Sequence, residues 1–484
     1  MSREAFPSLI VRANKIEPQG VFAEALARYL RPDARACAGL ARLLAARQAG
    51  VVAHFYMDPE LQGTLAACSS AHVHISDSLE MAARAVQMAG AGARAIVVLG
   101  VDFMSENVRA VFDAAGFDRV PVYRVTREPI GCSLAEAAEG PAYGAYLARA
   151  AETPRSLHVI YINTSLRTKA NAQRLLPTMT CTSSNVVRTV LQARAQIPEL
   201  SVWYGPDTYM GGNLRQLFAG LARLDDDGAV RELHREHERA SIADLLGRFH
   251  YFPQGVCIVH HLFGAEIART VERDYEDALV TAHLEVPGEM FALALAAQRQ
   301  GRGVVGSTAN ILRFVGEAVQ AAARAGRGGR LRFVLGTEAA MVTPIMRRVQ
   351  ALLREHDGAA AGGLEAEIIF PVADEAVART EDAELAVVPG VASGEGCSTA
   401  GGCATCPYMK MSSLGALLDL LARIGVEPDE SLVAFHPRKY ADTIGGRTVA
   451  DLGGEPILHM REFQRTGRLP DALVADVLGR GGPT

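Results

Sequence analysis

Short apolar runs alternate with longer segments of helical periodicity along most of the chain. Each run has the length of a buried strand. The predicted strands cover residues 51–56, 95–101, 120–125, 157–163, 200–205, 255–260, 278–286, 303–307, 331–337 and 366–372. Amphipathic stretches such as 78–92 and 311–326 lie between them and predict helices. This alternation predicts an α/β fold with parallel sheets, in which ligands bind at the carboxyl ends of the strands.

Three segments share one local pattern, in which small polar residues stand directly before a predicted helix. They are ISDSLEMA (75–82), TSSNVVRTV (182–190) and GSTANILRFV (306–315). Such residues usually serve as helix N-caps, but a helix N-terminus also offers free N–H groups to anions. We therefore expect three related α/β units that face a common anionic ligand.

Polar residues occur in pairs at the ends of four predicted strands. The pairs are His54 with Tyr56, Tyr161 with Asn163, Cys257 with His260, and His283 with Glu285. Since side chains alternate along a strand, Cys257 and His260 would face opposite sides unless a turn follows. One polar residue at a strand end is more often structural. Four pairs supply imidazole, phenol, amide and carboxylate groups for acid–base work and carbonyl binding.

Three of the eight cysteines are placed where thiolates could act together. Cys132 opens a predicted helix, Cys257 lies in a predicted strand of the second group, and Cys406 opens a third helical stretch. Three thiolates at one centre suit either an iron–sulfur cluster with one open iron or a zinc site, and spacing alone does not separate these. Cys403 and Cys406 also form a Cys-x-x-Cys pair, which occurs in redox, zinc and iron–sulfur sites.

The overall composition excludes several classes of protein. The formal charge is −5 over 484 residues, which argues against a general nucleic-acid binder. The chain contains no run of 18 apolar residues, so we expect no membrane span. The first residues lack the apolar core of a signal peptide, and we therefore expect a cytoplasmic protein.

A series of longer motifs occurs between about residues 51 and 424. In chain order they read AHFYMDPELQ, SDSLEMA, VDFMSE, GCSLAEA, YINTS, TSSN, the PD of YGPDTYMGG, CIVHHLF, AHLEVPGEM, GSTANI, GTE and CPYMKMSSL. This order resembles the quinolinate synthase family, and the wording AHLEVPGEM resembles its plant-type branch. No single motif is decisive, but coincidence across the whole series is very unlikely.

The resemblance implies a fold of three α/β domains around a pseudo-threefold axis. The implied ranges are an arm at 1–31, domains at 32–150, 151–265 and 266–426, and an extension at 427–484. It also implies a 4Fe–4S cluster held by Cys132, Cys257 and Cys406, one from each domain, with the fourth iron left for substrate. Cys181 and Cys403 do not match the ligand positions.

The implied reaction condenses iminoaspartate with dihydroxyacetone phosphate to quinolinate, with release of phosphate and water. An L-aspartate oxidase or dehydrogenase would supply the iminoaspartate. Glu285 is the expected main base, assisted by Tyr56 and Tyr161, with His260 and His283 completing the polar centre. The expected substrate-binding residues are His54, Ser78, Tyr161, Asn163, Ser183, His283, Glu285, Ser307 and Thr308.

Two alternatives from other classes stay open on the sequence alone. One is a zinc-stabilised α/β binding protein that uses the loop containing Cys397, Cys403 and Cys406. The other is a cluster-bearing redox or sensor protein on the same fold. Independently of these, a Cys403–Cys406 disulfide could withdraw a cluster ligand and switch the enzyme off.

Overall fold

Three β-sheets, each built on four parallel strands in the same order, form the framework of the molecule. The computed structural model describes residues 5–28, 30–68, 70–356, 363–371 and 405–480. The first sheet has the order β4 (Val73–Ser76), β3 (Ala49–His54), β5 (Ala95–Leu99) and β6 (Val122–Arg124). The second has β8 (Thr178–Cys181), β7 (Ser156–Tyr161), β9 (Ser201–Gly205) and β10 (Phe249–Tyr251). The third has β12 (Gly303–Gly306), β11 (Leu279–His283), β13 (Gly329–Gly336) and β14 (Leu364–Ile369).

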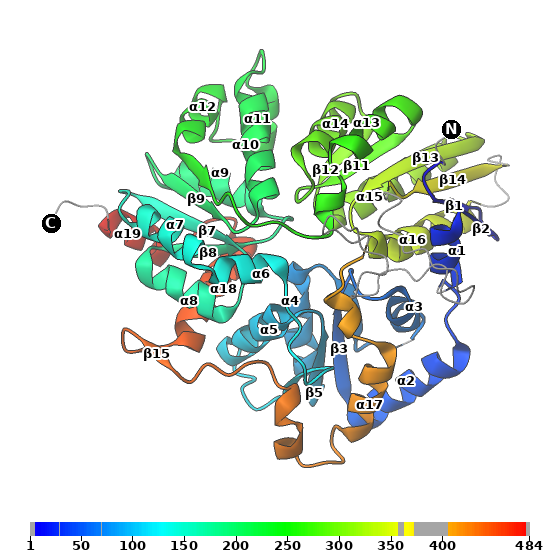
Figure 1. Cartoon of the computed structure of the whole chain (residues 1–484), viewed down its shortest axis with the longest axis horizontal. Coiled ribbons are helices and arrows are strands. Elements are labelled where there is room, and N and C mark those ends of the chain that lie inside the picture. Colours follow the sequence, from blue (N-terminus) through cyan, green and yellow to red (C-terminus); the bar gives the residue numbers. More distant parts are fainter. Residues whose placement is uncertain (1–4, 29, 69, 357–362, 372–404, 481–484) are drawn as a thin grey trace.

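Counted along the chain within each sheet, the order is therefore second, first, third, fourth strand in all three. Figure 1 shows the three sheets and their helices arranged around a common centre. The predicted α/β fold with parallel sheets is confirmed. The division of the chain into the predicted domain ranges stays a prediction.

The helices follow the strands as the alternating pattern predicts. Their bounds are α1 Val21–Arg28, α2 Ala34–Arg47, α3 Pro59–Ala67, α4 Ser78–Gly90, α5 Asp102–Ala114, α6 Ser133–Glu139, α7 Pro141–Ala151, α8 Leu166–Leu175, α9 Val186–Gln196, α10 Thr208–Ala222, α11 Gly228–Leu233, α12 Arg239–Arg248, α13 Ala265–Asp274, α14 Gly288–Arg299, α15 Thr308–Arg324, α16 Val342–Glu355, α17 Leu414–Arg423, α18 Val449–Thr466 and α19 Asp471–Gly479. The 3₁₀ helices include η1 (His260–Leu262) and η4 (Met409–Met411). None of the described helices is long and apolar enough to cross a bilayer.

The same backbone arrangement recurs at the carboxyl end of each sheet. The last residues of the first two strands pair as His54 with Ser76, Tyr161 with Cys181, and His283 with Gly306. In each case the residue after the first strand donates its N–H to the last carbonyl of the second, at 3.0, 2.9 and 3.1 Å respectively. The second strand then leads into α4, α9 or α15, as the three polar segments predict. The three equivalent strand ends therefore direct different side chains toward one centre.

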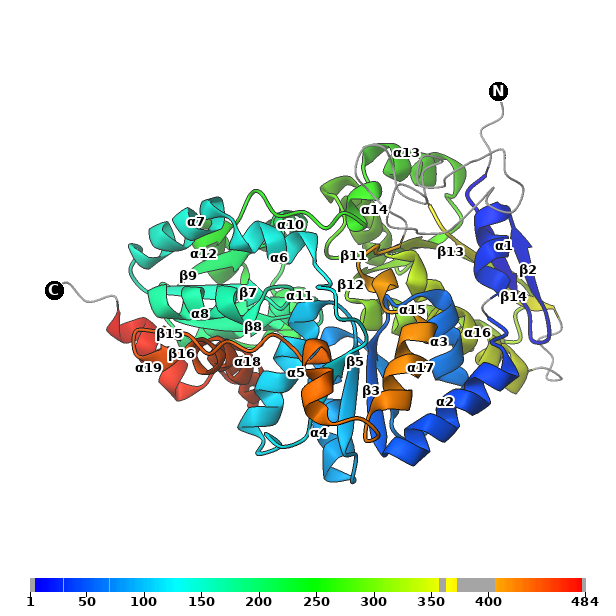
Figure 2. The same cartoon turned by 60° about the horizontal axis from the view of Figure 1, so that its bottom comes forward.

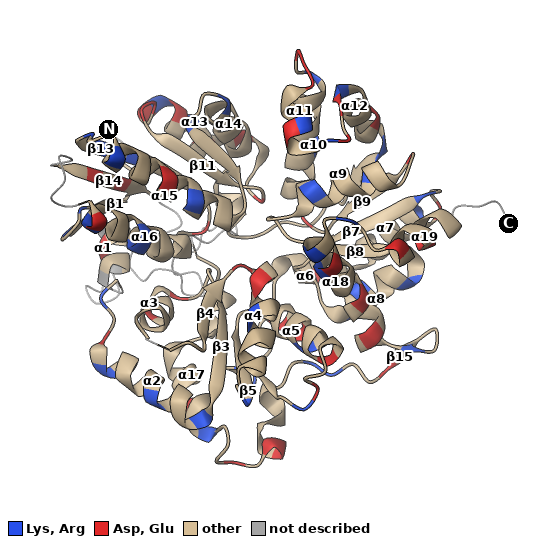
Figure 3. Ribbon diagram, turned by 180° about the vertical axis from the view of Figure 1, so that it is seen from behind, with Lys and Arg blue, Asp and Glu red and all other residues tan. Residues whose placement is uncertain are grey.

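Both chain ends pack onto this framework. β1 (Ser8–Val11) pairs antiparallel with β14, and β2 (Ile16–Gln19) pairs antiparallel with β1, so the N-terminal residues extend the third sheet. At the other end, α17 packs against α2, and α18 packs against α8, β8 and α5. Figure 2 shows this C-terminal segment running along the first and second sheets. Seen from behind, charges of both signs are mixed over the outer helices and loops (Figure 3).

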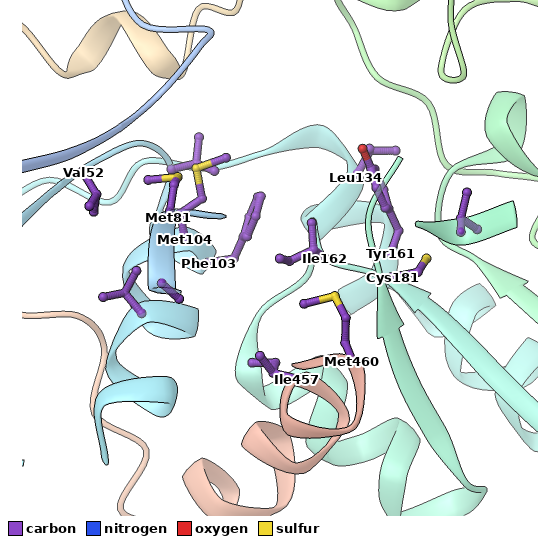
Figure 4. Close-up of a cluster of buried hydrophobic side chains, with 14 of the residues drawn as sticks. Val52, Met81, Phe103, Met104, Leu134, Tyr161, Ile162, Cys181, Ile457 and Met460 are labelled. Carbon is purple, nitrogen blue, oxygen red and sulfur yellow. The ribbon is translucent and has the colours of Figure 1, made fainter. Parts of the chain in front are cut away.

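The largest apolar cluster joins all three sheets and the C-terminal segment, because it also contains Val280, Val334 and Ile369 of the third sheet. The largest cluster of buried residues includes Val52 and Met81 of the first unit, Ile162 and Cys181 of the second, and Met460 of α18. Figure 4 shows these side chains in one cluster, with Met460 next to the second sheet. A separate cluster lies around the third sheet and includes the N-terminal strands.

One predicted strand is wrong. Residues 255–260 (GVCIVH) form no strand; they run as an irregular segment and a turn into η1, which begins at His260. This local geometry decides how Cys257 and His260 are arranged, because strand alternation does not apply to them.

Candidate active site

A pocket lies where the carboxyl ends of the three sheets meet, and it collects most of the predicted site residues. The predicted residues that line it are His54, Tyr56, Ser78, Cys132, Tyr161, Asn163, Ser183, Cys257, His283, Glu285, Thr308 and Cys406. Strands or strand–helix loops of all three units contribute. The other two predicted residues do not line the pocket. His260 contacts Glu285, and Ser307 is the N-cap of α15, where it is hydrogen-bonded to Asn310.

The carboxylate of Glu285 is the centre of a buried polar cluster. Glu285 is 3% exposed, and its Oε1 accepts a hydrogen bond from the hydroxyl of Tyr161. Its Oε2 lies 3.0 Å from Nδ1 of His260. Burial alone would raise the pKa of Glu285, but the His260 and His283 imidazoles and the Tyr161 hydroxyl together lower it to about 2. Glu285 is therefore ionised at neutral pH.

His283 lies beside this carboxylate and has defined hydrogen bonds. The main-chain N–H of Glu285 donates to Nδ1 of His283 at 3.3 Å, so the proton of the neutral ring is on Nε2, which donates to Ser183 Oγ at 3.2 Å. Burial lowers the pKa of His283 to about 3 and that of His54 to about 4, so both rings are neutral at pH 7. The rings of His283 and His260 stack with centroids 4.8 Å apart.

His260 connects the carboxylate to a thiol. Its Nδ1 also lies 3.3 Å from Cys257 Sγ, because the turn before η1 brings these side chains together. Its Nε2 is buried without a hydrogen-bond partner among the described residues. The ligand atoms of Cys257, His260 and Glu285 all lie within 4.8 Å of one another, which is close enough to hold one metal ion.

The three cysteines predicted as metal ligands reach the same pocket from separate loops. Cys132 is the N-cap of α6, and Cys406 stands just before η4. Burial raises the pKa of Cys132 to about 11, although the N–H groups of Ala135 and Leu134 favour the thiolate. Burial also raises the pKa of Cys257 and Cys406, and Cys257 is influenced by the other two thiols. Three partly buried thiols that line one pocket and resist ionisation without a cation fit a thiolate-binding metal group.

The hydroxyl groups at the helix starts face the pocket as predicted for Ser78, Ser183 and Thr308. Among the lining residues that were not predicted, one is ionisable: Asp77, the N-cap of α4. Its Oδ2 accepts a 2.7 Å hydrogen bond from Ser184, which joins the first and second units at the pocket edge. Burial raises the pKa of Asp77, although that hydrogen bond favours its ionised form. The motif SDS (76–78) contains Asp77, but an Asp before a helix is ordinarily explained as an N-cap, so the sequence did not indicate a place in the pocket.

The structure does not test the hypotheses about the Cys-x-x-Cys loop. Cys397 and Cys403 lie outside the described residues, so a loop zinc site and a Cys403–Cys406 disulfide stay predictions.

Comparison with known proteins identifies the family. Residues 38–353 match the family model described as quinolinate synthetase A protein. The chain belongs to this family. It is 53% identical to a quinolinate synthase, chloroplastic, of Nicotiana tabacum over 99% of this chain and 67% of that protein. It is 52% identical to the Arabidopsis thaliana protein of the same name and 50% identical to that of Oryza sativa, over 99% of this chain and 68% and 70% of theirs.

These relatives confirm the resemblance and the prediction of an enzyme, and they correct one expectation. The chain spans about two thirds of the length of these relatives. The predicted cytoplasmic location is contradicted, because these quinolinate synthases are named as chloroplastic. The prediction relied on the missing apolar core of a signal peptide. That criterion does not detect a transit peptide, which is amphipathic and rich in Ser and Arg.

Proposed function

We propose that this quinolinate synthase condenses iminoaspartate with dihydroxyacetone phosphate, releasing phosphate and water, and that it carries a 4Fe–4S cluster. The main support is the convergence of Cys132, Cys257 and Cys406 on the pocket that also holds Glu285. These three thiols would hold the cluster. When bound, such a cluster would supply a Lewis-acid iron that polarises a carbonyl or hydroxyl oxygen.

The residues around the pocket suit a substrate with several anionic groups. Ser78 and Thr308 are the first residues of α4 and α15, and helix N-termini stabilise anions through free N–H groups. Asn163 and Ser183 add an amide and a hydroxyl from the second unit. We assign these four residues to binding the carboxylates and the phosphate, with Asn163 able to donate to a carboxylate oxygen or accept from an amine.

Glu285 and Tyr161 are the proposed groups for moving protons. Glu285 is ionised and so can accept a proton, although a pKa of about 2 makes it a weak base in this environment. Tyr161 donates to that carboxylate, so a proton taken up by Glu285 can pass to the Tyr161 oxygen while the hydroxyl proton of Tyr161 passes to substrate. Neutral His283 donates through Nε2 and is held by the Glu285 main chain, which suits it to orient a substrate oxygen.

Iron binding by cysteine variants tests the proposed cofactor. Cys132→Ala, Cys257→Ala and Cys406→Ala are each reconstituted anaerobically with iron and sulfide, with Cys181→Ala as the matched control. Cys181 is a free cysteine at the end of β8 that is fully buried, whereas the three candidate ligands are partly buried, and it does not line the pocket. We expect the three variants to lose the stable cluster and the control to keep it. A stable full cluster in any of the three would contradict this ligand set.

Turnover tests the reaction itself. The reconstituted protein is supplied with dihydroxyacetone phosphate and with iminoaspartate generated in place by an L-aspartate oxidase or dehydrogenase, the proposed source of this unstable substrate. We expect quinolinate and phosphate in equal amounts. Cluster-loaded protein that forms no quinolinate under these conditions would favour a redox or sensor protein.

A further inference from the structure

Lys169 in α8 is completely buried, and it does not line the pocket. Lysine is almost never fully buried unless its charge is paired. Its Nζ donates to the carbonyl oxygen of Ile162 at 3.1 Å and to that of Thr164. These two carbonyls flank Asn163, whose side chain reaches the pocket. The amine of Lys169, whose pKa burial lowers to about 7, therefore holds the backbone on both sides of one predicted substrate-binding residue.

The rest of this turn is fixed by hydrogen bonds as well. The N–H of Ile162 donates to Cys181 O at 2.9 Å, and the N–H of Thr164 donates to Ile162 O at 2.7 Å. The hydroxyl of Thr164 donates to Tyr161 O at 3.1 Å. Without Lys169, the Thr164 carbonyl would be buried with no other described partner, so an apolar residue could fill the space but could not hold the turn.

The charge of Lys169 is balanced from a different unit. Glu106 of α5 is 3% exposed, and its charge attracts Lys169, although burial opposes the charged form of both groups. Its Oε2 accepts the N–H of Leu166 at 2.9 Å, and its Oε1 accepts the hydroxyl of Tyr440 at 3.0 Å. Tyr440 belongs to the C-terminal extension. Three parts of the chain thus meet at one buried carboxylate beside the turn.

We infer that Lys169 is a positioning residue that holds the Tyr161–Ser165 turn so that Asn163 faces the substrate. Glu106 balances its charge, and Tyr440 ties that carboxylate to the C-terminal extension. This inference rests on the proposed function, because it assigns Asn163 to substrate binding.

The direct test replaces Lys169 by methionine, which keeps the length and apolar volume of the side chain and removes both hydrogen bonds. The matched control is Lys439→Met, since Lys439 is an exposed lysine of the C-terminal extension. We expect Lys169→Met to bind as much iron as wild type but to melt below it, because it leaves the Thr164 carbonyl without a described partner and removes the group that faces the buried Glu106 carboxylate. Its KM should rise at least about tenfold with a smaller change in kcat, as loss of charged hydrogen bonds to a binding segment predicts.

Amide hydrogen exchange gives a second readout that needs no turnover. In Lys169→Met the amides of residues 163–165 should exchange at least about tenfold faster, while those of the β7 strand keep their wild-type rates. Unchanged KM and unchanged exchange in a folded Lys169→Met protein would overturn the inference. Equal loss of protection over the whole second sheet would also overturn it, because that result describes a structural role only.

Glu106→Gln decides the case if Lys169→Met does not fold. Glutamine removes the charge and keeps one acceptor oxygen, which can receive the N–H of Leu166, while its NH2 group can donate to the hydroxyl oxygen of Tyr440. A raised KM and faster exchange at 163–165 in this variant would support the inference, and wild-type values for both would overturn it. If wild type itself forms no quinolinate, the proposed function fails, whereas the exchange comparison still tests what Lys169 holds.

Discussion

Two adjacent glycines in α18 give a pair of substitutions with opposite expected signs. Gly453 and Gly454 are both buried in the interior of this helix, where alanine is favoured over glycine by about 1 kcal/mol. A Cβ on Gly454 would lie 3.6 Å from the Cβ of Ala110, which is an ordinary van der Waals contact. Gly454→Ala should therefore raise the free energy of unfolding by about 0.5–1 kcal/mol.

At Gly453 the same methyl group has no room. Its nearest neighbours would be the carbonyl oxygen, carbonyl carbon and Cα of Leu166, with the oxygen well below the 3.0 Å that real Cβ atoms respect. Leu166 is the first residue of α8, and its N–H is bonded to Glu106, so this backbone is held from its other side. Overpacking typically costs about 1–3 kcal/mol, and rigid backbone on both sides favours the upper end. After the helix-propensity gain, Gly453→Ala should lower the free energy of unfolding by about 2 kcal/mol.

Urea unfolding followed by tryptophan fluorescence measures this difference. The chain has one tryptophan, Trp203, and it lies in β9 of the sheet whose strand β8 packs against α18. The signal therefore reports on the unit that receives the helix. The two variants should differ by about 2.5–3 kcal/mol at equal m-value. A Gly453→Ala protein as stable as Gly454→Ala would refute the claim that α18 and the start of α8 are in rigid backbone contact.

Three further predictions concern catalysis, the pH dependence of stability and one hydrogen bond between units. Glu285→Gln should keep its iron and lose about 10²–10⁴ in kcat, and a kcat within about threefold of wild type would exclude Glu285 as the base. His158 is buried between Tyr143 and the Trp203 carbonyl, and burial lowers its pKa from 6.5 to about 4. Below pH 6.5 the ring is protonated in the unfolded chain but stays neutral in the native protein. The free energy of unfolding therefore falls between pH 6.5 and 4, by up to about 3 kcal/mol for this group. Equilibrium unfolding of His158→Gln should lack that part of the pH dependence. Ser184→Ala removes the 2.7 Å hydrogen bond to Asp77, and equilibrium unfolding should give a free energy of unfolding about 1 kcal/mol lower than that of wild type; an unchanged value would contradict a stabilising role for this bond.

The interiors of the three sheets could be predicted from the sequence because their strands are continuous apolar runs. The edge strands β4 and β8 were not predicted, since VHIS and TMTC carry too many polar residues for that signal. The pairing of β1 with β14 joins residues about 360 positions apart, and no local pattern encodes such a partner. The segment around Cys257 misled the prediction in the other direction, because an apolar run does not distinguish a strand from a buried turn.

The positions of several candidate site residues could be predicted because these residues end strands. His54, Tyr161 and His283 each end a strand, so alternation and fold type placed them correctly at one edge. Asp77 and Lys169 were missed for a common reason. Their importance arises from partners in distant parts of the chain, and in the sequence one resembles a helix cap and the other an ordinary helix-surface lysine.

The repeated strand ends separate the shape of the pocket from its chemistry. Three nearly equivalent backbone frames present His54, Tyr161 and His283 from equivalent positions, each frame closed by its own N–H to carbonyl bond. The three equivalent positions therefore carry an asymmetric set of side chains on a repeated backbone arrangement, and the backbone bond that closes each frame does not depend on which side chain the frame carries. Substitutions at these three positions can in this way change the chemistry of the pocket while the backbone that positions the side chains stays the same.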